Sequence, residues 1–389
     1  MHEGTWLRDR AAFVGFGHTR YGRRGELAAN GPVPLVVEAV VKACEDAGVS
    51  PADIDGYCSY SNDPVDAGTL ASTFGAKALR FTAMGWGGGG GAMCGAFLYA
   101  AMAVATGQAD LVAVTHVIVQ GGAFGRRWGG MDRPLPRFPL LASPGQSFAL
   151  AARRHMHDYG TTIDHFGEVA INARRNAANN PEARFREEIT MEDHHSSRMI
   201  ADPLRLLDFC MEGDSGNCVI LASAERAADL RQPAVLLAGA AMGSPYRWGM
   251  GMFGGNNMPA ADFASAGQRT VAEDLYRNAG MGPEDVDVAN IYDHFTPMVL
   301  MGLEDFRFVP KGESGPFVAE GGIRREGKLP VNTHGGNLAE VYNHGMSHVF
   351  EAMRQLRGTS CNQVDGAEVA LVVAGSSPSP SSAMLLRKG

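Results

Sequence analysis

The stretch Ala47-Gly48-Val49-Ser50-Pro51-Ala52-Asp53-Ile54-Asp55 decides the fold, because the chain contains a near copy of it. The second copy is Ala279-Gly280-Met281-Gly282-Pro283-Glu284-Asp285-Val286-Asp287, and each copy follows an amphipathic helical pattern and precedes an apolar, strand-like run. A helix that ends in Gly, a turn that begins with Pro and a strand form one supersecondary unit. Two copies in 389 residues predict a duplicated α/β fold with halves 1–232 and 233–389. We expect the active site where these halves meet.

Short apolar stretches alternate with helical patterns around both copies, which favours largely parallel sheets covered by helices. The first half is expected to contain strands at 12–16, 54–60, 111–117 and 217–222, and helices at 34–47 and 92–105. The second half is expected to contain a helix that ends before Gly280, and strands at 234–241, 288–292, 368–374 and 383–387. The last two strands have the pattern of a hairpin.

Composition excludes several classes of function. Hydrophobic residues at 45% and charged residues at 20% are typical of an ordered globular protein. The net charge of −8 gives no electrostatic support for nucleic-acid binding. The six cysteines contain no Cys-x-x-Cys spacing and the N-terminus has no apolar signal-peptide core, so we expect a cytoplasmic protein.

Residues 81–107 carry no charge, but the first part of this stretch is rich in glycine. The remaining helical part, 92–105, is shorter than the roughly 20 residues that cross a bilayer. A helix that is small and apolar on every side is instead expected at the centre of a large protein or at a subunit interface.

Residues 120–200 interrupt the alternation and read as an inserted loop or lid region. They hold 11 Arg, no Lys and nine acidic residues. An insertion of this kind usually covers or shapes a site. Its arginines could meet phosphates or a carboxylate of a substrate, or the region could be a solvated helical lid.

Four motifs in order resemble the thiolase superfamily over nearly the whole chain, in the branch typified by the thiolase part of sterol carrier protein x. They are Ala103-Val104-Ala105-Thr106-Gly107-Gln108-Ala109-Asp110, Met211-Glu212-Gly213-Asp214-Ser215-Gly216, Ile291-Tyr292-Asp293-His294-Phe295 and Asn332-Thr333-His334-Gly335-Gly336. The resemblance implies a duplicated thiolase fold, with two five-stranded mixed sheets, helices in layers and the inserted loop domain. It also implies assembly at least as dimers, with the helix 92–105 buried between subunits.

The chain departs from that family at its reactive positions. Counting back from Thr106-Gly107, the position of the family's nucleophilic cysteine corresponds to Gly90 in this chain. The two slots of the family's histidines fall on Tyr292 and Tyr342, and the late catalytic cysteine has no counterpart in 372–378. A chain without these thiols cannot form an acyl-enzyme or run Claisen chemistry.

The two tyrosines suggest a retro-aldol cleavage, which needs an acid, a base and donors for a thioester enolate. This combination resembles the lipid-transfer-protein-type aldolases that remove steroid side chains as acyl-CoA thioesters, leaving a ketone and a short acyl-CoA such as propionyl-CoA. The resemblance implies catalytic roles for Tyr292 and Tyr342, whose phenols are expected to converge from the two halves. Neighbours such as Asp293 and the histidines would have to lower a phenol pKa for it to act as a base. The remaining site residues expected from the resemblance are His294 and His344 for catalysis, and Gly90, Asp293, His334, Gly335 and Gly336 for substrate binding.

The resemblance further implies a homodimer, a small zinc-ribbon and OB-fold partner that helps to bind the CoA ester, and no cofactor beyond the CoA of the substrate. Three alternatives stay open. His344 and His348, four residues apart, could bind a metal with His334 or His294, although a pocket-lining and packing role is favoured. Cys94 could replace the missing nucleophile. The chain could also be a non-catalytic acyl-CoA or lipid-binding protein.

Overall fold

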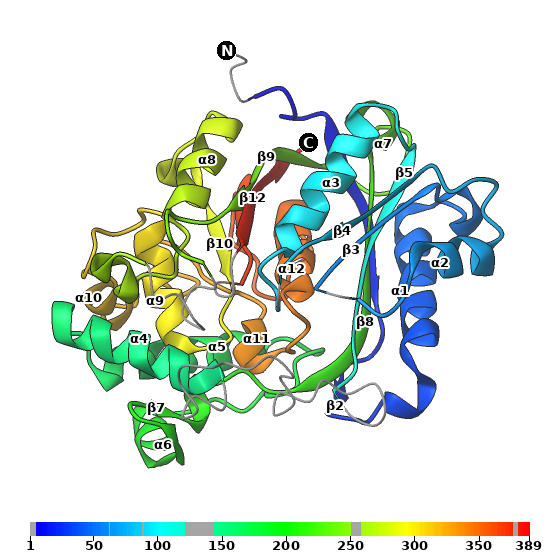
Figure 1. The fold of residues 1–389 in the computed structure, drawn as a ribbon. Coiled ribbons are helices and arrows are strands. Elements are labelled where there is room, and N and C mark those ends of the chain that lie inside the picture. Colours follow the sequence, from blue (N-terminus) through cyan, green and yellow to red (C-terminus); the bar gives the residue numbers. More distant parts are fainter. Residues whose placement is uncertain (1–4, 62, 88, 121–143, 250–257, 376–379) are drawn as a thin grey trace.

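One mixed sheet of ten strands organises the computed structural model, which describes residues 5–61, 63–87, 89–120, 144–249, 258–375 and 380–389 (Figure 1). The strand order is β10-β11-β12-β9-β1-β8-β5-β3-β4, with β2 paired to β8. The strands are β1 (Ala11–His18), β2 (Gly22–Arg23), β3 (Gly56–Tyr60), β4 (Phe81–Gly85), β5 (Leu111–Ile118), β8 (Gly213–Ser223), β9 (Val235–Gly243), β10 (Val288–Ile291), β11 (Val369–Val373) and β12 (Ser381–Lys388).

The expected pair of five-stranded sheets is instead one continuous sheet with two arms. Strands β1 and β9 join the arms through the antiparallel pairs Ala12↔Leu236 and Phe13↔Val235. The first arm has five strands on the main path, β4-β3-β5-β8-β1, and the second has four, β9-β12-β11-β10. On the side of β10 that faces away from β11, the described chain makes only the isolated β-bridge Ala289↔Val331. The backbone turns left-handed at Asn332, with φ 51°, so a fifth strand does not continue there.

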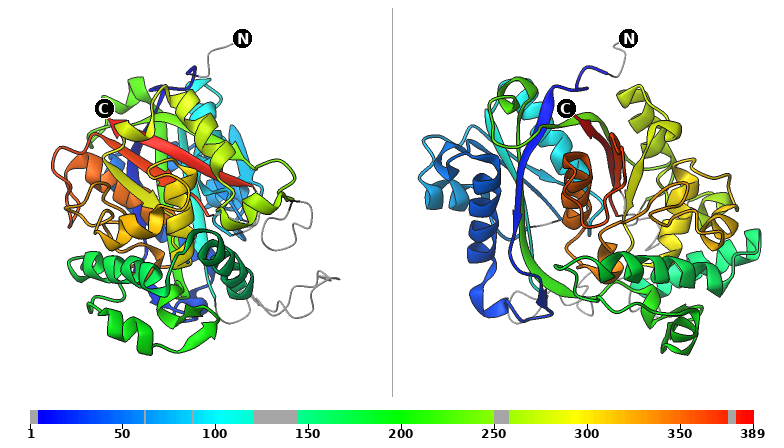
Figure 2. Two further views of the ribbon diagram at one scale, coloured as in Figure 1. Left: turned by 90° about the vertical axis from the view of Figure 1, so that its left-hand side faces the viewer. Right: turned by 180° about the vertical axis from the view of Figure 1, so that it is seen from behind.

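Helices form layers on both sides of each arm (Figures 1 and 2). Helix α1 (Pro32–Ala47) packs on β1 and β8, and α2 (Ala67–Phe74) also contacts the first arm. Helices α3 (Met93–Ala105) and α12 (Met346–Arg357) lie between the arms and share one buried core with strands of both. Helices α8 (Arg269–Ala279) and α9 (Thr296–Asp305) cover the far side of the second arm. The short helix α7 (Ala224–Ala227) precedes β9.

The duplicated unit is confirmed by equivalent contacts in the two halves. Helices α1 and α8 both end at a left-handed glycine, Gly48 with φ 75° and Gly280 with φ 62°. In each half a strand glycine lets the helix approach closely. A Cβ atom on Gly15 of β1 would lie 2.7 Å from the Cβ of Ala47, and one on Gly239 of β9 would lie 2.8 Å from the Cβ of Ala279. The predicted boundary at 232 falls between α7 and β9, and the division into two domains stays a prediction.

The described part of the inserted region is mainly helical, which corrects the expectation of a loop domain. It contains α4 (Pro144–Tyr159), α5 (Ile163–Ala178) and α6 (Met191–Ser196), and just after it β6 (Met199–Ala201), which begins at its end, pairs with β7 (Leu204–Arg205). Together with α10 (Ser314–Ala319) and α11 (Gly336–Ala339), it forms the lower left part of Figure 1. Four of the eleven arginines, Arg126, Arg127, Arg133 and Arg137, lie outside the described residues.

The uncharged helix α3 is covered mainly by its own chain. Most of its residues are buried between the sheet arms, although Met102 is 40% exposed. The second arm therefore shields α3 from solvent, and this burial does not depend on a partner subunit alone. Within the described ranges, no helix is both long and apolar enough to span a membrane.

Candidate active site

Tyr292 follows β10 and lies in a cradle of three glycines. A Cβ atom on Gly90 would come 2.3 Å from Cε2 of the Tyr292 ring. Cβ atoms on Gly345 and Gly375 would come 3.1 Å from Cδ2 and 3.3 Å from Cε1. Gly345 also has φ 93°, a conformation that favours glycine. The tyrosine ring therefore fills the space that a cysteine side chain at position 90 would need.

Tyr342 follows α11 and meets Tyr292 in a small buried cluster with Ile118 of β5 and the half-buried Cys210. Both phenols belong to the second half of the chain, which corrects the expectation that they converge from the two halves. The first half contributes Ile118 and Gly90 to their surroundings. The halves thus do meet at this point, although only one of them supplies tyrosines.

The surroundings of Tyr292 raise its pKa, so they do not provide the lowering that a phenol acting as a base would need. Burial is the main cause that raises the pKa of Tyr292 well above 10, and the neighbouring Tyr342 phenol and a hydrogen bond with it add to the effect. Burial also lowers the pKa of His294 to about 3, so that ring is neutral and cannot stabilise a phenolate as a cation. Tyr292 is consequently a neutral phenol, able to donate a proton, at neutral pH.

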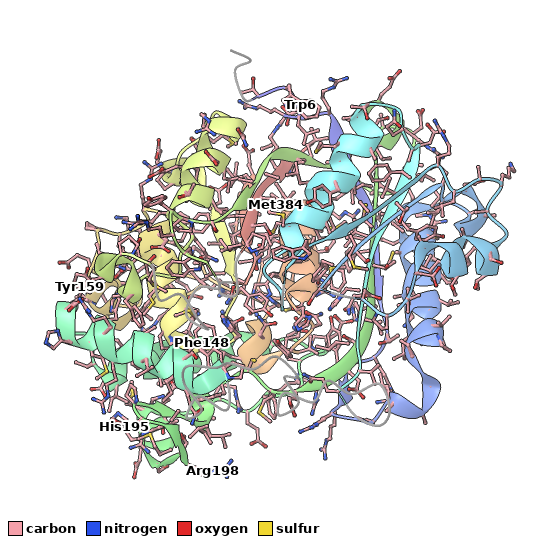
Figure 3. All side chains as sticks on the ribbon, in the orientation of Figure 1. Trp6, Phe148, Tyr159, His195, Arg198 and Met384 are labelled. Atoms are coloured by element: carbon pink, nitrogen blue, oxygen red, sulfur yellow. The ribbon has the colours of Figure 1, made fainter. Side chains whose placement is uncertain are left out.

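His294 is 8% exposed and packs edge-on between two aromatic rings. Its centroid lies 5.0 Å from that of Tyr292 and 4.6 Å from that of Phe148, which α4 brings from the inserted region. Figure 3 places Phe148 toward the middle of the molecule, whereas His195 and Arg198 lie at its outer edge. Neither nitrogen of His294 has a hydrogen-bond partner within the described residues. A neutral imidazole in this state can donate one N–H to a ligand.

His344 is linked to two residues of the first half that the sequence interpretation missed. Its Nδ1 lies 2.9 Å from Nε2 of His116, and Nδ1 of His116 lies 3.0 Å from Oδ2 of Asp63. All three residues are buried. The available signal was a histidine inside the buried strand β5, but one buried histidine in a sequence does not reveal its partners.

The rings of His344 and His348 face different partners. His344 precedes α12 with φ 56°, so the two residues do not share a helical face as their spacing suggested. Nε2 of His348 lies 3.2 Å from Oδ1 of Asp293 and 3.2 Å from the carbonyl of Ile291. In the described part of the chain, no group of three or more His, Cys, Asp or Glu side chains is arranged to hold a metal ion.

Four of the predicted substrate-binding residues have internal partners. Asp293 accepts hydrogen bonds from the backbone N–H groups of Asn337 at 2.7 Å and Leu338 at 3.3 Å. A Cβ atom on Gly336 would lie 2.0 Å from Oδ2 of Asp293, and one on Gly335 would lie 2.8 Å from Cβ of Ala177 in α5.

His334 is fully buried 3.7 Å from Glu340, and burial is the main cause that lowers the His334 pKa. This group therefore shapes the turn that presents Tyr342. A direct role of Asp293, His334, Gly335 or Gly336 in substrate binding stays a prediction.

Cys94 lies one turn into the buried layer and has the properties of a packing residue. It is fully buried, and its Sγ lies 3.5 Å from the carbonyl of Val372. Burial raises the pKa of its thiol, which disfavours the thiolate that a nucleophile requires.

An apolar groove of about 130 Å³ adjoins the narrow slot at Tyr342. Phe185 and Met211 line both, and the arginines 174 and 184 place their guanidinium groups over the Phe185 ring at 4.8 and 5.6 Å. The other residues that line the groove are Ala170, Ile189, Leu206, Leu207, Phe209 and Leu338. The inserted region thus brings apolar side chains and two cations close to the tyrosines.

Comparisons with known proteins extend this description. Residues 255–387 match the family described as Thiolase C-terminal domain-like. The chain is 40% identical to a steroid side-chain-cleaving aldolase of Thermomonospora curvata, over 98% of both chains. It is also 40% identical to the 17-hydroxy-3-oxo-4-pregnene-20-carboxyl-CoA lyase of Mycobacterium tuberculosis, over 98% of this chain and 100% of that one. The solved structure of an Ltp2-ChsH2(DUF35) aldolase superposes with a TM-score of 0.90 at 40% identity and covers 98% of each chain.

Proposed function

The chain belongs to the thiolase superfamily, in its sterol carrier protein 2-type branch, and from this premise we propose that it cleaves a β-hydroxyacyl-CoA by a retro-aldol reaction. The observation that carries the proposal is the Tyr292 ring, which occupies the place of the family's nucleophilic side chain beside Gly90. No thiol stands at position 90, Cys94 is buried, and burial raises the pKa of the Cys210 thiol beside the two tyrosines, so these thiols are poorly suited to form an acyl-enzyme. Two adjacent phenols can instead move protons without a covalent intermediate.

Tyr292 suits the acid role. It is a neutral phenol in a buried site, and a proton donor must be protonated at the working pH. In the reaction it gives its proton to the α-carbon of the enolate. The phenol of Tyr342 then receives the proton of the β-hydroxyl group.

His294 suits the role of a donor to the thioester oxygen. Its ring is neutral, it contacts the Tyr292 ring, and neither nitrogen has a partner within the described residues. A fixed N–H in a buried site stabilises the negative charge that develops on the enolate oxygen as the carbon–carbon bond breaks.

The substrate class is inferred from relatives and from the groove. The names of the two 40% identical relatives refer to steroid side-chain cleavage and to a pregnene carboxyl-CoA. The groove beside Tyr342 has an apolar lining that matches part of a hydrocarbon group, and the arginines 174 and 184 match the phosphates of CoA. We therefore propose a steroid side-chain CoA thioester, which gives a ketone and a short acyl-CoA such as propionyl-CoA.

One of the same relatives supports the proposed partner. The 40% identical solved structure pairs its aldolase with a DUF35 protein. We propose a homodimer that binds a comparable small zinc-ribbon and OB-fold partner, acting in the cytoplasm on soluble thioesters.

A product assay tests the proposal. The chain, alone and with a DUF35-type partner, is incubated with a panel of β-hydroxyacyl-CoA esters that differ in the steroid or aliphatic group. Mass spectrometry is expected to find a ketone and a short acyl-CoA in equal amounts, and no product with the Tyr292→Phe variant. Tight binding of every ester without any turnover would favour a non-catalytic acyl-CoA-binding protein, and an acyl group on Cys94 would favour a thiolase.

A further inference from the structure

We propose that Asp63, His116 and His344 form a buried proton relay that serves Tyr342 and makes it the group that accepts the β-hydroxyl proton. This inference rests on the proposed function and adds to it the groups that would enable Tyr342 to act as the base. Asp63, His116 and His344 are positioning residues in it, because they act on the substrate through Tyr342.

The contact between His116 and His344 joins the two halves, and the Tyr342 ring lies beside His344. Asp63 follows β3 and His116 lies in β5, whereas His344 and Tyr342 come from the turn before α12. The contacts are 3.0 Å from Asp63 Oδ2 to His116 Nδ1 and 2.9 Å from His116 Nε2 to His344 Nδ1. The backbone N–H groups of Val65 and Val117 donate to Asp63 at 3.0 and 2.8 Å, which fixes the carboxylate.

The backbone at His344 is held in an uncommon conformation that directs its ring into this chain. A φ of 56° is uncommon for a residue other than glycine. The hydroxyl of Tyr60 donates to the His344 carbonyl at 3.2 Å, and the Tyr60 ring stacks on His116 with centroids 4.2 Å apart. Such strain, when its surroundings enforce it, is characteristic of functional positions.

The charge of Asp63 sets the direction of the relay. A carboxylate beside His116 Nδ1 favours a proton on that nitrogen, so Nε2 of His116 accepts the Nδ1–H of His344. Nε2 is then the basic nitrogen of His344. The Tyr342 ring lies edge-on to the His344 ring, with centroids 5.1 Å apart and an interplanar angle of 89°.

The proton count balances without an external acid or base. The β-hydroxyl O–H bond breaks and its proton moves to the Tyr342 oxygen, while the Tyr342 proton moves to His344 and Asp63 stabilises the imidazolium. The electrons of the Cα–Cβ bond enter the thioester enolate, and Tyr292 protonates the α-carbon. The hydrogen bond between the two phenols then lets the proton on His344 return through Tyr342 to Tyr292.

The two histidines next to Tyr292 are arranged differently from His344. Its histidine neighbour His294 stays neutral, because burial lowers the His294 pKa to about 3. The ring of His348 lies 6.0 Å from that of Tyr292 and stacks on it, while its Nε2 contacts Asp293. The two phenols therefore differ in their access to a base, and Tyr342 is the one next to it.

The test compares His116→Gln with His155→Gln in the full chain with its partner. His155 is a matched control, since it is equally buried and lies 3.0 Å from a buried carboxylate, that of Glu304, outside the site. Two substrates are used, a β-hydroxyacyl-CoA and an analogue with fluorine atoms that make its β-hydroxyl more acidic. We expect His116→Gln and Asp63→Asn to lower kcat at least about tenfold with little change in KM, while His155→Gln keeps kcat within a few-fold.

The fluorinated substrate separates a relay from a structural role. A more acidic hydroxyl needs less help from a base, so the kcat defect of His116→Gln and of Tyr342→Phe should shrink with it. A His116→Gln kcat near that of the wild type, the same loss in His155→Gln, or an equal loss with both substrates would each overturn the relay. If the wild-type protein cleaves neither substrate, the proposed function itself fails.

Discussion

At the scale of residues, the site is governed by which side chain fills one small volume. The ring of Tyr292 and a Cβ atom at position 90 compete for the same space, with 2.3 Å between them if both were present. Real Cβ contacts do not approach so closely, and the ring is also confined by Gly345 and Gly375. Three predictions belong to this scale.

Gly90→Ala should displace the Tyr292 ring. We expect a loss of stability of about 1–3 kcal/mol, as for other overpacked positions, and a loss of kcat comparable to that of a Tyr292 substitution. Gly243→Ala is the control, because a Cβ atom there has no neighbour within 4 Å. Thermal unfolding and turnover measure both effects. A Gly90→Ala variant with unchanged activity would contradict this geometry.

Removal of one phenolic hydroxyl should stop proton transfer without unfolding the chain. Tyr292→Phe and Tyr342→Phe keep the rings that fill the cluster, so each should fold normally and lower kcat on the order of 10²-fold or more. Substrate binding should change far less, because the transfer contributes mainly to the transition state. Near wild-type turnover of both variants would leave the histidines 294 and 344 as the leading candidates.

His294 should make the protein sensitive to acid. The folded state keeps His294 neutral down to about pH 3, whereas the unfolded chain binds a proton near 6.5, so stability falls as the pH falls from 6.5 toward 3. Between pH 7.5 and pH 5 this residue should cost about 2 kcal/mol of unfolding free energy. Denaturant unfolding at the two pH values should show a smaller decrease for His294→Gln than for the wild type, and parallel decreases would contradict the prediction.

At the scale of elements, α3 is a buried helix packed between the two arms of the sheet. Its small residues let both arms approach, and a Cβ atom on Gly95 would lie 2.3 Å from the sulfur of Met242 in β9. Packing of this kind accounts for the absence of charged residues in α3. Neither a membrane span nor a reactive thiol is needed to explain it.

Cys94→Ala in α3 is therefore expected to leave lyase turnover within a few-fold. The change removes only a buried sulfur that contacts the Val372 carbonyl, so stability should fall by about 1 kcal/mol. Steady-state kinetics and intact-protein mass spectrometry of the acyl-CoA-treated enzyme measure the result. Abolished turnover, or an acyl adduct lost in the variant, would indicate thiolase chemistry.

Elements and contacts differed in how far the sequence could predict them. Helix α1 and strands β5, β9 and β11 lie within about two residues of their predicted bounds, because strong periodicity and glycine stops are local signals. The β1–β9 joint and the Asp63–His116 contact depend on residues far apart in the chain, and no local pattern encodes them. The raised pKa of Tyr292 depends mainly on burial, and the sequence alone does not give the extent of that burial.

At the scale of the whole molecule, the exposed edge of the sheet replaces α3 as the basis for expecting a dimer. Strand β4 ends the first arm; Met84 within it is 46% exposed, and Trp86 directly after it is 77% exposed. An edge strand with unpaired backbone groups and a large exposed aromatic ring is typical of a surface that binds another chain.

Trp86→Ser should accordingly weaken the homodimer. Trp6 is the matched control, because it is 46% exposed near the N-terminus, at the top of Figure 3. Sedimentation velocity across a dilution series is expected to show a larger monomer fraction for Trp86→Ser than for the wild type or Trp6→Ser. A wild-type protein that is a fully active monomer at low concentration would contradict the proposed assembly.

The glycine cradle around Tyr292 also restricts the evolutionary paths open to this enzyme. A lineage that gained cysteine at position 90 while keeping Tyr292 would pass through a sterically blocked intermediate, because the new Cβ atom overlaps the ring. Under the proposed function, a change to a thiolase must therefore begin at position 292, with a variant that lacks the proposed acid and still has no nucleophile. Neither order of the two substitutions retains activity at the halfway point, so the change of chemistry is expected to be effectively irreversible by single steps.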